Sequence, residues 1–100
     1  MKKEEAQIDI ELTEEVADGI YANLAIINHS NTEFVVDFVK VMPGTSKAKV
    51  KSRIILTPQH AKRLLRALRE NLARYERNHG EIAEDDYPVP FHFGGPTGEA

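Results

Sequence analysis

Cysteine is missing from this 100-residue chain, which excludes a disulfide framework, a thiolate metal site and a cysteine nucleophile. Long apolar runs are missing as well. No stretch approaches the roughly 18 consecutive apolar residues of a transmembrane helix, and residues 1–5 lead into no apolar segment of the kind found in signal peptides. From these absences we expect a cytoplasmic protein that makes no contact with a membrane.

Charge is plentiful but unevenly distributed. The composition, 41% hydrophobic and 29% charged, is that of a chain that folds, and the length is that of one small domain. The net charge of −3 conceals −5 in residues 1–19, +7 in residues 20–80 and −5 in residues 81–100. This asymmetry indicates a charged partner, unless the long polar side chains only solvate a helix face.

Four segments have the alternating or β-branched pattern of strands. They are residues 8–12, 20–27, 34–39 and 50–56, and turn-forming residues at 28–31 and 42–46 separate the last three. In the second segment, a helix that starts near Thr13 is an alternative, because Val16, Ile20 and Leu24 are spaced by four residues. The turn formers at 28–31 predict a hairpin.

A long amphipathic helix follows the last strand. Thr57 is a favourable N-cap, and Pro58 suits the first helical position, whose N–H has no partner within a helix. Gly80 can end the helix because glycine accepts a positive φ. Apolar residues at helical spacing predict a stripe that is buried against the sheet. We call it the leucine stripe: Ala61, Leu64, Leu65, Leu68, Leu72 and Tyr75.

Together these segments predict an α+β fold, with a four-stranded antiparallel β-meander followed by one long C-terminal helix, in the order ββββα. A single domain then occupies residues 6–80, between a disordered N-terminus (1–5) and a flexible tail (81–100) that is acidic and rich in proline and glycine. One helix leaves the second sheet face open, and the apolar residues expected there favour a homodimer. These residues are Ile27, Val35, Val39, Val41 and Ile55.

No constellation of catalytic residues is found in the sequence. The histidines are spread over separate segments without the spacing of metal ligands, and the nearest approach to a site is His92 with Asp85 and Asp86 in the tail. The serines lack the glycines of a nucleophile elbow. Asp37 is expected on the solvent face of its strand. We therefore expect no enzyme activity, no metal and no cofactor.

Basic residues form the one candidate site, because lysine and arginine release counterions when they meet phosphates. The candidates are Lys47, Lys49, Lys51, Arg53, Lys62, Arg63 and Arg66, with Tyr21 for base stacking and Asn23 for hydrogen bonding to a base edge. Lysines on an outer strand also protect it from pairing with other sheets. The sequence thus predicts a non-enzymatic nucleic-acid-binding protein, with single-stranded nucleic acid as a candidate partner. The alternative is a protein–protein interaction adaptor whose arginine-rich helix docks on an acidic protein surface without nucleic-acid contact.

Two stretches, NHSNTEFVVDF (28–38) and TPQHAKRLL (57–65), resemble a family of small bacterial proteins classed as a domain of unknown function. The resemblance covers roughly residues 18–82. It implies no catalytic residue, but it implies a role near transcription, with the transcription machinery as a partner. More distantly, the order ββββα is similar to the PUR repeat of single-stranded nucleic-acid-binding proteins. PUR proteins usually carry several repeats, whereas this chain carries one.

Overall fold

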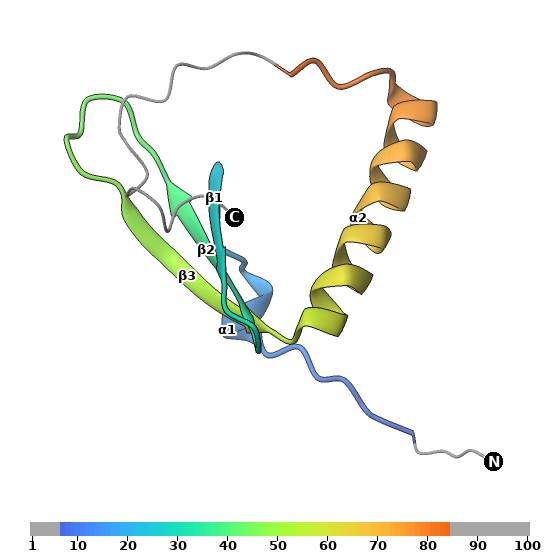
Figure 1. Ribbon diagram of the computed structural model, residues 1–100. Coiled ribbons are helices and arrows are strands. Elements are labelled where there is room, and N and C mark those ends of the chain that lie inside the picture. Colours follow the sequence, from blue (N-terminus) through green and yellow to red (C-terminus); the bar gives the residue numbers. More distant parts are fainter. Residues whose placement is uncertain (1–6, 85–100) are drawn as a thin grey trace.

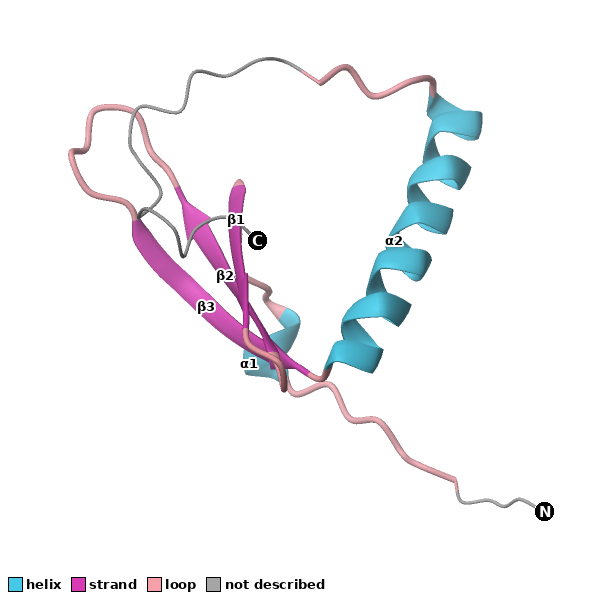
Figure 2. Ribbon diagram, viewed as in Figure 1, coloured by secondary structure: helices cyan, strands magenta, loops and turns pink. Residues whose placement is uncertain are grey.

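The computed structural model describes residues 7–84 and has the α+β class expected from the sequence (Figures 1 and 2). Five elements follow one another: α1 (Glu14–Ala17), β1 (Leu24–His29), β2 (Phe34–Lys40), β3 (Lys49–Leu56) and α2 (Pro58–His79). The strands form an antiparallel sheet in the order β1-β2-β3. The meander and the long C-terminal helix are therefore confirmed, but residues 7–84 contain three strands where we expected four.

The prediction of a strand at residues 8–12 is wrong. This segment extends away from the sheet (Figure 1), and its apolar side chains are widely exposed, with Ile10 at 91% and Ile8 at 81%. Alternating apolar and acidic residues suit the edge of a sheet, but a strand forms only where a neighbouring strand supplies hydrogen bonds. In the described part of the chain, residues 8–12 meet no such neighbour.

Residues 13–19 form the single helical turn and glycine-ended bend that their sequence indicates, and the alternative of a helix continuing through Ile20 to Leu24 is wrong. Thr13 caps a single helical turn, α1, because its side chain accepts a hydrogen bond from the Val16 N–H at 3.3 Å. Gly19, with φ at 79°, then turns the chain in a conformation that other residues rarely adopt. Strand β1 begins at Leu24, later than the expected start at residue 20.

The hairpin predicted at residues 28–31 connects β1 to β2. The Ser30 N–H donates a hydrogen bond to the Glu33 carbonyl at 2.9 Å, and the Ser30 hydroxyl accepts hydrogen bonds from the N–H groups of Thr32 and Glu33 at 3.1 and 3.3 Å. A short side chain that binds the backbone two or three residues ahead fixes a turn. The register of β1 against β2 follows from it, with His29 opposite Phe34.

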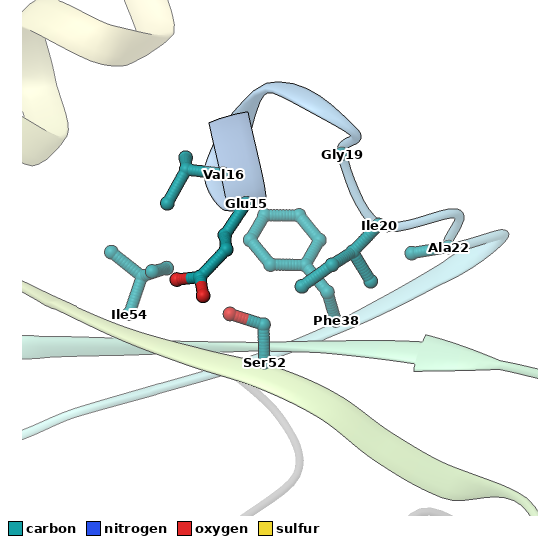
Figure 3. Close-up of a pocket in the computed structure, with 8 residues that line it drawn as sticks. All are labelled: Glu15, Val16, Gly19, Ile20, Ala22, Phe38, Ser52 and Ile54. Atoms are coloured by element: carbon teal, nitrogen blue, oxygen red, sulfur yellow. The ribbon is translucent and has the colours of Figure 1, made fainter. Parts of the chain in front are cut away.

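The sheet has two unlike faces, because neighbouring residues of a strand point to opposite sides. One face, which we call the α1 face, lies beneath α1 and carries Phe38 and Ile54 (Figure 3). The other, which we call the Asp37 face, carries Asp37 opposite Arg53. The five apolar residues expected on one open face are therefore divided. Val35, Val39 and Ile55 lie on the Asp37 face, Ile27 lies on the α1 face opposite Val36, and Val41 follows the end of β2.

The sheet buries little by itself. Among residues 7–84, the buried hydrophobic side chains are Val36 and Val39, which point to opposite faces of the central strand β2. Asp37 is buried between them, with 6% of its surface exposed, which corrects the expectation of a solvent-facing carboxylate. Much of the apolar surface of residues 7–84 is thus uncovered.

Helix α2 begins and ends where the sequence predicts. The Thr57 hydroxyl accepts a hydrogen bond from the His60 N–H at 3.1 Å, and Pro58 occupies the first turn. At the other end, Gly80 takes a φ of 93°, and its N–H donates to the Glu76 carbonyl at 2.9 Å. The 22 residues of α2 give a helix about 33 Å long.

The leucine stripe of α2 is not buried against the sheet, contrary to the sequence-based prediction. The helix diverges from the sheet after its first turn, so it contacts β3 only near the connection between them (Figure 1). Leu65 and Leu68 are each 54% exposed, and Leu64 and Leu72 are each 44% exposed. Since complete burial of a leucine contributes about 1.5–3 kcal/mol, each of these side chains leaves about 1 kcal/mol unrealised. In the part of the chain that the structure describes, the sheet and the helix therefore each lack cover.

Candidate nucleic-acid interface

The side of α2 away from the leucine stripe is basic. Successive helix residues are about 100° apart, so residues 62, 66, 69 and 77 fall on one side. The cations on this side are all exposed and span about 22 Å of helix length. We call them the basic face: Lys62, Arg63, Arg66, Arg69, Arg74 and Arg77. Of the two acidic residues on α2, Glu76 accepts a hydrogen bond from the Ile82 N–H at 3.0 Å, while Glu70 lies among the cations.

The candidates Lys62, Arg63 and Arg66 form the N-terminal half of the basic face. Arg69, Arg74 and Arg77 extend it toward the end of α2 and belong to the same basic side of the helix in the sequence. Their spacing identifies them, because Arg69 follows Arg66 at i+3 and Arg77 follows Arg74 at i+3. The helix therefore brings together the three selected residues and the three further arginines of its basic side.

A β-bulge at Lys51 divides the basic residues of β3. Before the bulge, Lys49 lies on the α1 face; after it, Arg53 lies on the Asp37 face opposite Asp37. Lys47 precedes the strand, in the loop between β2 and β3. These residues therefore do not form the single stripe that simple alternation predicts.

Arg53 is held in an ion pair. Its Nε and Nη2 atoms donate hydrogen bonds to the two carboxylate oxygens of Asp37 at 2.7 and 2.9 Å, a bidentate arrangement. The Asp37 side chain is 8% exposed and that of Arg53 is 62% exposed, so water reaches the pair from the guanidinium side. The hydrogen bond from Arg53, helped by its charge, lowers the pKa of Asp37 below its usual value, although burial opposes this. Because the pair is neutral as a whole, Arg53 is a poor cation for a phosphate.

Asp37→Asn is expected to make the free energy of unfolding vary less with pH in the acid range. The pKa of Asp37 is lower in the folded chain than its usual value, so the ion pair stabilises the fold above the ordinary aspartate pKa of about 3.9. That contribution is lost as the pH falls through the lower, folded-state pKa. The loss is small because water screens the exposed guanidinium. Urea unfolding of both proteins over a series of pH values from neutral into acid measures it, and a stability difference that does not shrink as the pH falls contradicts the prediction.

Asn23 has a structural role. Its Nδ2 donates a hydrogen bond to the Val41 carbonyl at 3.0 Å, and its Oδ1 accepts one from the Val41 N–H at 2.8 Å. The side chain thus continues the hydrogen-bond ladder beyond the end of β2, and an amide held in this way is not free to read a base edge. Tyr21 is 67% exposed, and the Lys40 Nζ lies 6.0 Å from its ring centroid. Its ring remains accessible for stacking.

An apolar groove of ≈ 470 Å³ lies between α1 and the sheet. In Figure 3 the Phe38 ring points from the sheet toward α1, and the Glu15 side chain points from α1 toward the sheet. We call this space the α1 groove, and its lining, as far as the structure describes the chain, includes no residue of α2. The lining residues are Glu15, Val16, Gly19, Ile20, Ala22, Phe38, Ser52 and Ile54. Few polar atoms are present to orient a small ligand, so the groove suits apolar side chains.

Within residues 7–84, no group of three His, Cys, Asp or Glu side chains is close enough together to hold a metal ion. The combination of His92 with Asp85 and Asp86 lies outside the described residues, as does the predicted tail beyond residue 84. In the same described part of the chain, no helix is both long and apolar enough to cross a membrane.

The family resemblance and the fold analogy have different outcomes. Comparisons with curated proteins and with solved structures gave no match. The likeness to the PUR repeat depends on four strands before the helix, and the described chain has three, so that analogy has no support. The resemblance to a domain of unknown function is confirmed: the family described as "Protein of unknown function (DUF3467)" matches residues 1–84, and the chain belongs to it.

Proposed function

We propose that this protein is a non-enzymatic nucleic-acid-binding protein whose basic face contacts the phosphates of a single strand. The supporting observation is the continuity of that face, with six exposed cations along one side of α2. Cations on a rigid helix bind a phosphate backbone through counterion release, without reading its sequence. The exposed ring of Tyr21 offers a stacking surface that any base can use.

The basic face is a better phosphate-binding surface than β3. On α2 the cations share one side, whereas on β3 the bulge at Lys51 divides them and Asp37 neutralises Arg53. Lys47, Lys49 and Lys51 are therefore a secondary surface in this proposal. Three cations can be removed from each surface, so the contributions of the two surfaces to binding can be compared at equal loss of charge.

The test replaces Lys62, Arg66 and Arg77 together by glutamine, a residue that keeps the helix propensity of α2. Affinity for a fluorescent single-stranded oligonucleotide is measured by anisotropy. We expect the dissociation constant to rise at least about tenfold, because each lost phosphate contact is a lost counterion release.

The matched control replaces Lys47, Lys49 and Lys51 by glutamine. Both triple variants remove the same charge, so a general field effect changes both equally. We expect the control to lose less than about threefold in affinity, since these residues are divided by the bulge. Equal losses contradict the assignment to α2. If the unaltered protein binds no oligonucleotide, nucleic-acid binding is rejected and an acidic protein surface becomes the partner of the basic face.

A further inference from the structure

Within residues 7–84, two apolar surfaces lack cover. On α2, the leucine stripe is about half exposed, as Leu68 at 54% illustrates. At the α1 groove, Val16 and Ile20 are 66% and 60% exposed, and Phe38 and Ile54 lie at its base. Exposed apolar surface of this extent indicates an interaction site.

We propose that two copies of the chain form a two-fold symmetric dimer in which the leucine stripe of each α2 fills the α1 groove of the other copy. The α2 helix of each copy then packs in the α1 groove of the other, so the same contact forms twice and the assembly is closed. The dimer does not depend on the function proposed above, because the cations of the basic face other than Arg69 lie away from the leucine stripe.

The connection between β3 and α2 favours the groove of a second copy over the chain's own groove. Thr57 alone joins Leu56, at the end of β3, to Pro58, at the start of α2. Its backbone is extended, with φ −68° and ψ 155°, and its hydroxyl caps the helix. The proline ring fixes the next φ. Folding α2 down onto its own sheet requires the chain to reverse within this one-residue connection, and a short connection of this kind favours exchange between copies.

The position and length of α2 are consistent with its packing on the sheet of a second copy. Helix α2 stands on the same side of the sheet as α1 but apart from it (Figures 1 and 3). At about 33 Å it is longer than β3, which at eight residues spans about 27 Å. One helix therefore covers the whole length of a partner's sheet. Two such contacts provide the extended apolar interface typical of permanent dimers.

Charge is complementary between the two surfaces. Glu15 lines the groove, and two further acidic residues, Glu14 and Asp18, are near Glu15 in the sequence. On α2, Arg69 neighbours Leu65 at i+4 and Leu72 at i+3, so a cation borders the leucine stripe. An acidic rim that receives a basic border sets the orientation of the helix in the groove.

Because the sequence has no cysteine, introduced thiols give a clean crosslinking test. One preparation carries Leu68→Cys in the leucine stripe, and a second, of distinguishable mass, carries Ser52→Cys in the α1 groove. The two are unfolded together, refolded, and treated with a short flexible bis-maleimide. We expect a covalent dimer that contains one chain of each kind, and much less crosslinking in either preparation alone.

If the leucine stripe packs elsewhere, the crosslinked products differ. Crosslinked dimers from the Leu68→Cys chain alone indicate that two leucine stripes pack on each other, and they overturn the proposal. A chain that carries both Leu68→Cys and Ser52→Cys distinguishes closure onto its own groove. If that chain forms an internally crosslinked monomer while the mixture gives no mixed dimer, the proposal is also overturned.

The oligomeric state provides a second test. Leu68→Glu places a charge in the leucine stripe, and the matched control Ala73→Glu places the same charge on the polar side of α2. By sedimentation, we expect the original protein and Ala73→Glu to have twice the chain mass of 11.3 kDa, and Leu68→Glu to be monomeric. Circular dichroism checks that the helix persists. An original protein that is monomeric at about 100 µM overturns the dimer.

Discussion

Leu68→Ala is expected to lower the free energy of unfolding by about 2–5 kcal/mol per chain, the cost for a leucine that is fully buried. In a single chain Leu68 is 54% exposed, and its truncation would cost less than about 1 kcal/mol, partly offset by the higher helix propensity of alanine. A large loss therefore measures burial of the leucine stripe by a second copy.

Thermal unfolding at protein concentrations from about 1 to about 100 µM separates these cases. If folding and association are coupled, the midpoint rises with concentration, because the folded dimer is favoured by mass action. A midpoint independent of concentration, together with a loss below about 1 kcal/mol for Leu68→Ala, contradicts a buried stripe.

Val36→Ala is the control for this prediction. Val36 is 9% exposed within one chain, so its truncation leaves a cavity whether or not a second copy is present. We expect it to destabilise the protein under all conditions. Leu68→Ala differs because its cost depends on association.

The ends of the elements could be predicted more accurately than their pairing. Thr57 with Pro58 and Gly80 mark α2 through local backbone chemistry, and Ser30 marks the hairpin in the same way. Local signals of this kind need only a few neighbouring residues. The segment 8–12 has the pattern of a strand, but pairing depends on an available edge elsewhere in the chain, which periodicity does not report.

Burial was the less predictable property, and the leucine stripe shows why. The pattern of α2 identifies which side of the helix is apolar. It does not identify the surface that covers this side, which can be the same chain or a second copy. The prediction of burial on the chain's own sheet therefore failed, although the stripe itself was located correctly.

The candidate site was predictable on the helix and not on the strand. Helical spacing is regular, so the basic face follows from the sequence alone. On β3, the bulge at Lys51 shifts the alternation by one residue, and one such shift moves Lys49 to the opposite face from Arg53. Asn23 shows a further limit, since its bond to Val41, 18 positions away along the chain, becomes visible only in the folded structure.

One helix can serve both proposed contacts. Apart from Arg69, which borders the leucine stripe, the cations of the basic face lie away from it, so burial of the stripe in a dimer leaves them in water. A dimer then presents two basic faces to one ligand. When a strand is long enough to reach both, the second contact is intramolecular and the apparent affinity exceeds that of one face.

Affinity for a single-stranded oligonucleotide that contacts one basic face is expected to fall about 20- to 300-fold between about 50 and about 200 mM salt. Each phosphate contact changes the slope of log affinity against log salt by about −0.7 for a single strand, and this range corresponds to roughly three to six contacts. Anisotropy titrations at several salt concentrations measure the slope.

The same titrations with the two triple variants locate the contacts. Replacing Lys62, Arg66 and Arg77 by glutamine is expected to make the slope shallower by about 2, because three phosphate contacts, at about 0.7 released counterions each, are lost. The variant of Lys47, Lys49 and Lys51 should keep the original slope. An unchanged slope in the α2 variant contradicts phosphate contact by the basic face.

An acidic polypeptide distinguishes nucleic-acid binding from general attraction to negative charge. Polyglutamate carries a comparable density of charge but no bases, so it gains nothing from stacking on Tyr21. We expect weaker binding to polyglutamate at the same salt, and we expect Tyr21→Ala to weaken binding of the oligonucleotide alone. Equal affinity for both polymers, unaffected by Tyr21→Ala, indicates that the basic face docks on acidic protein surfaces instead.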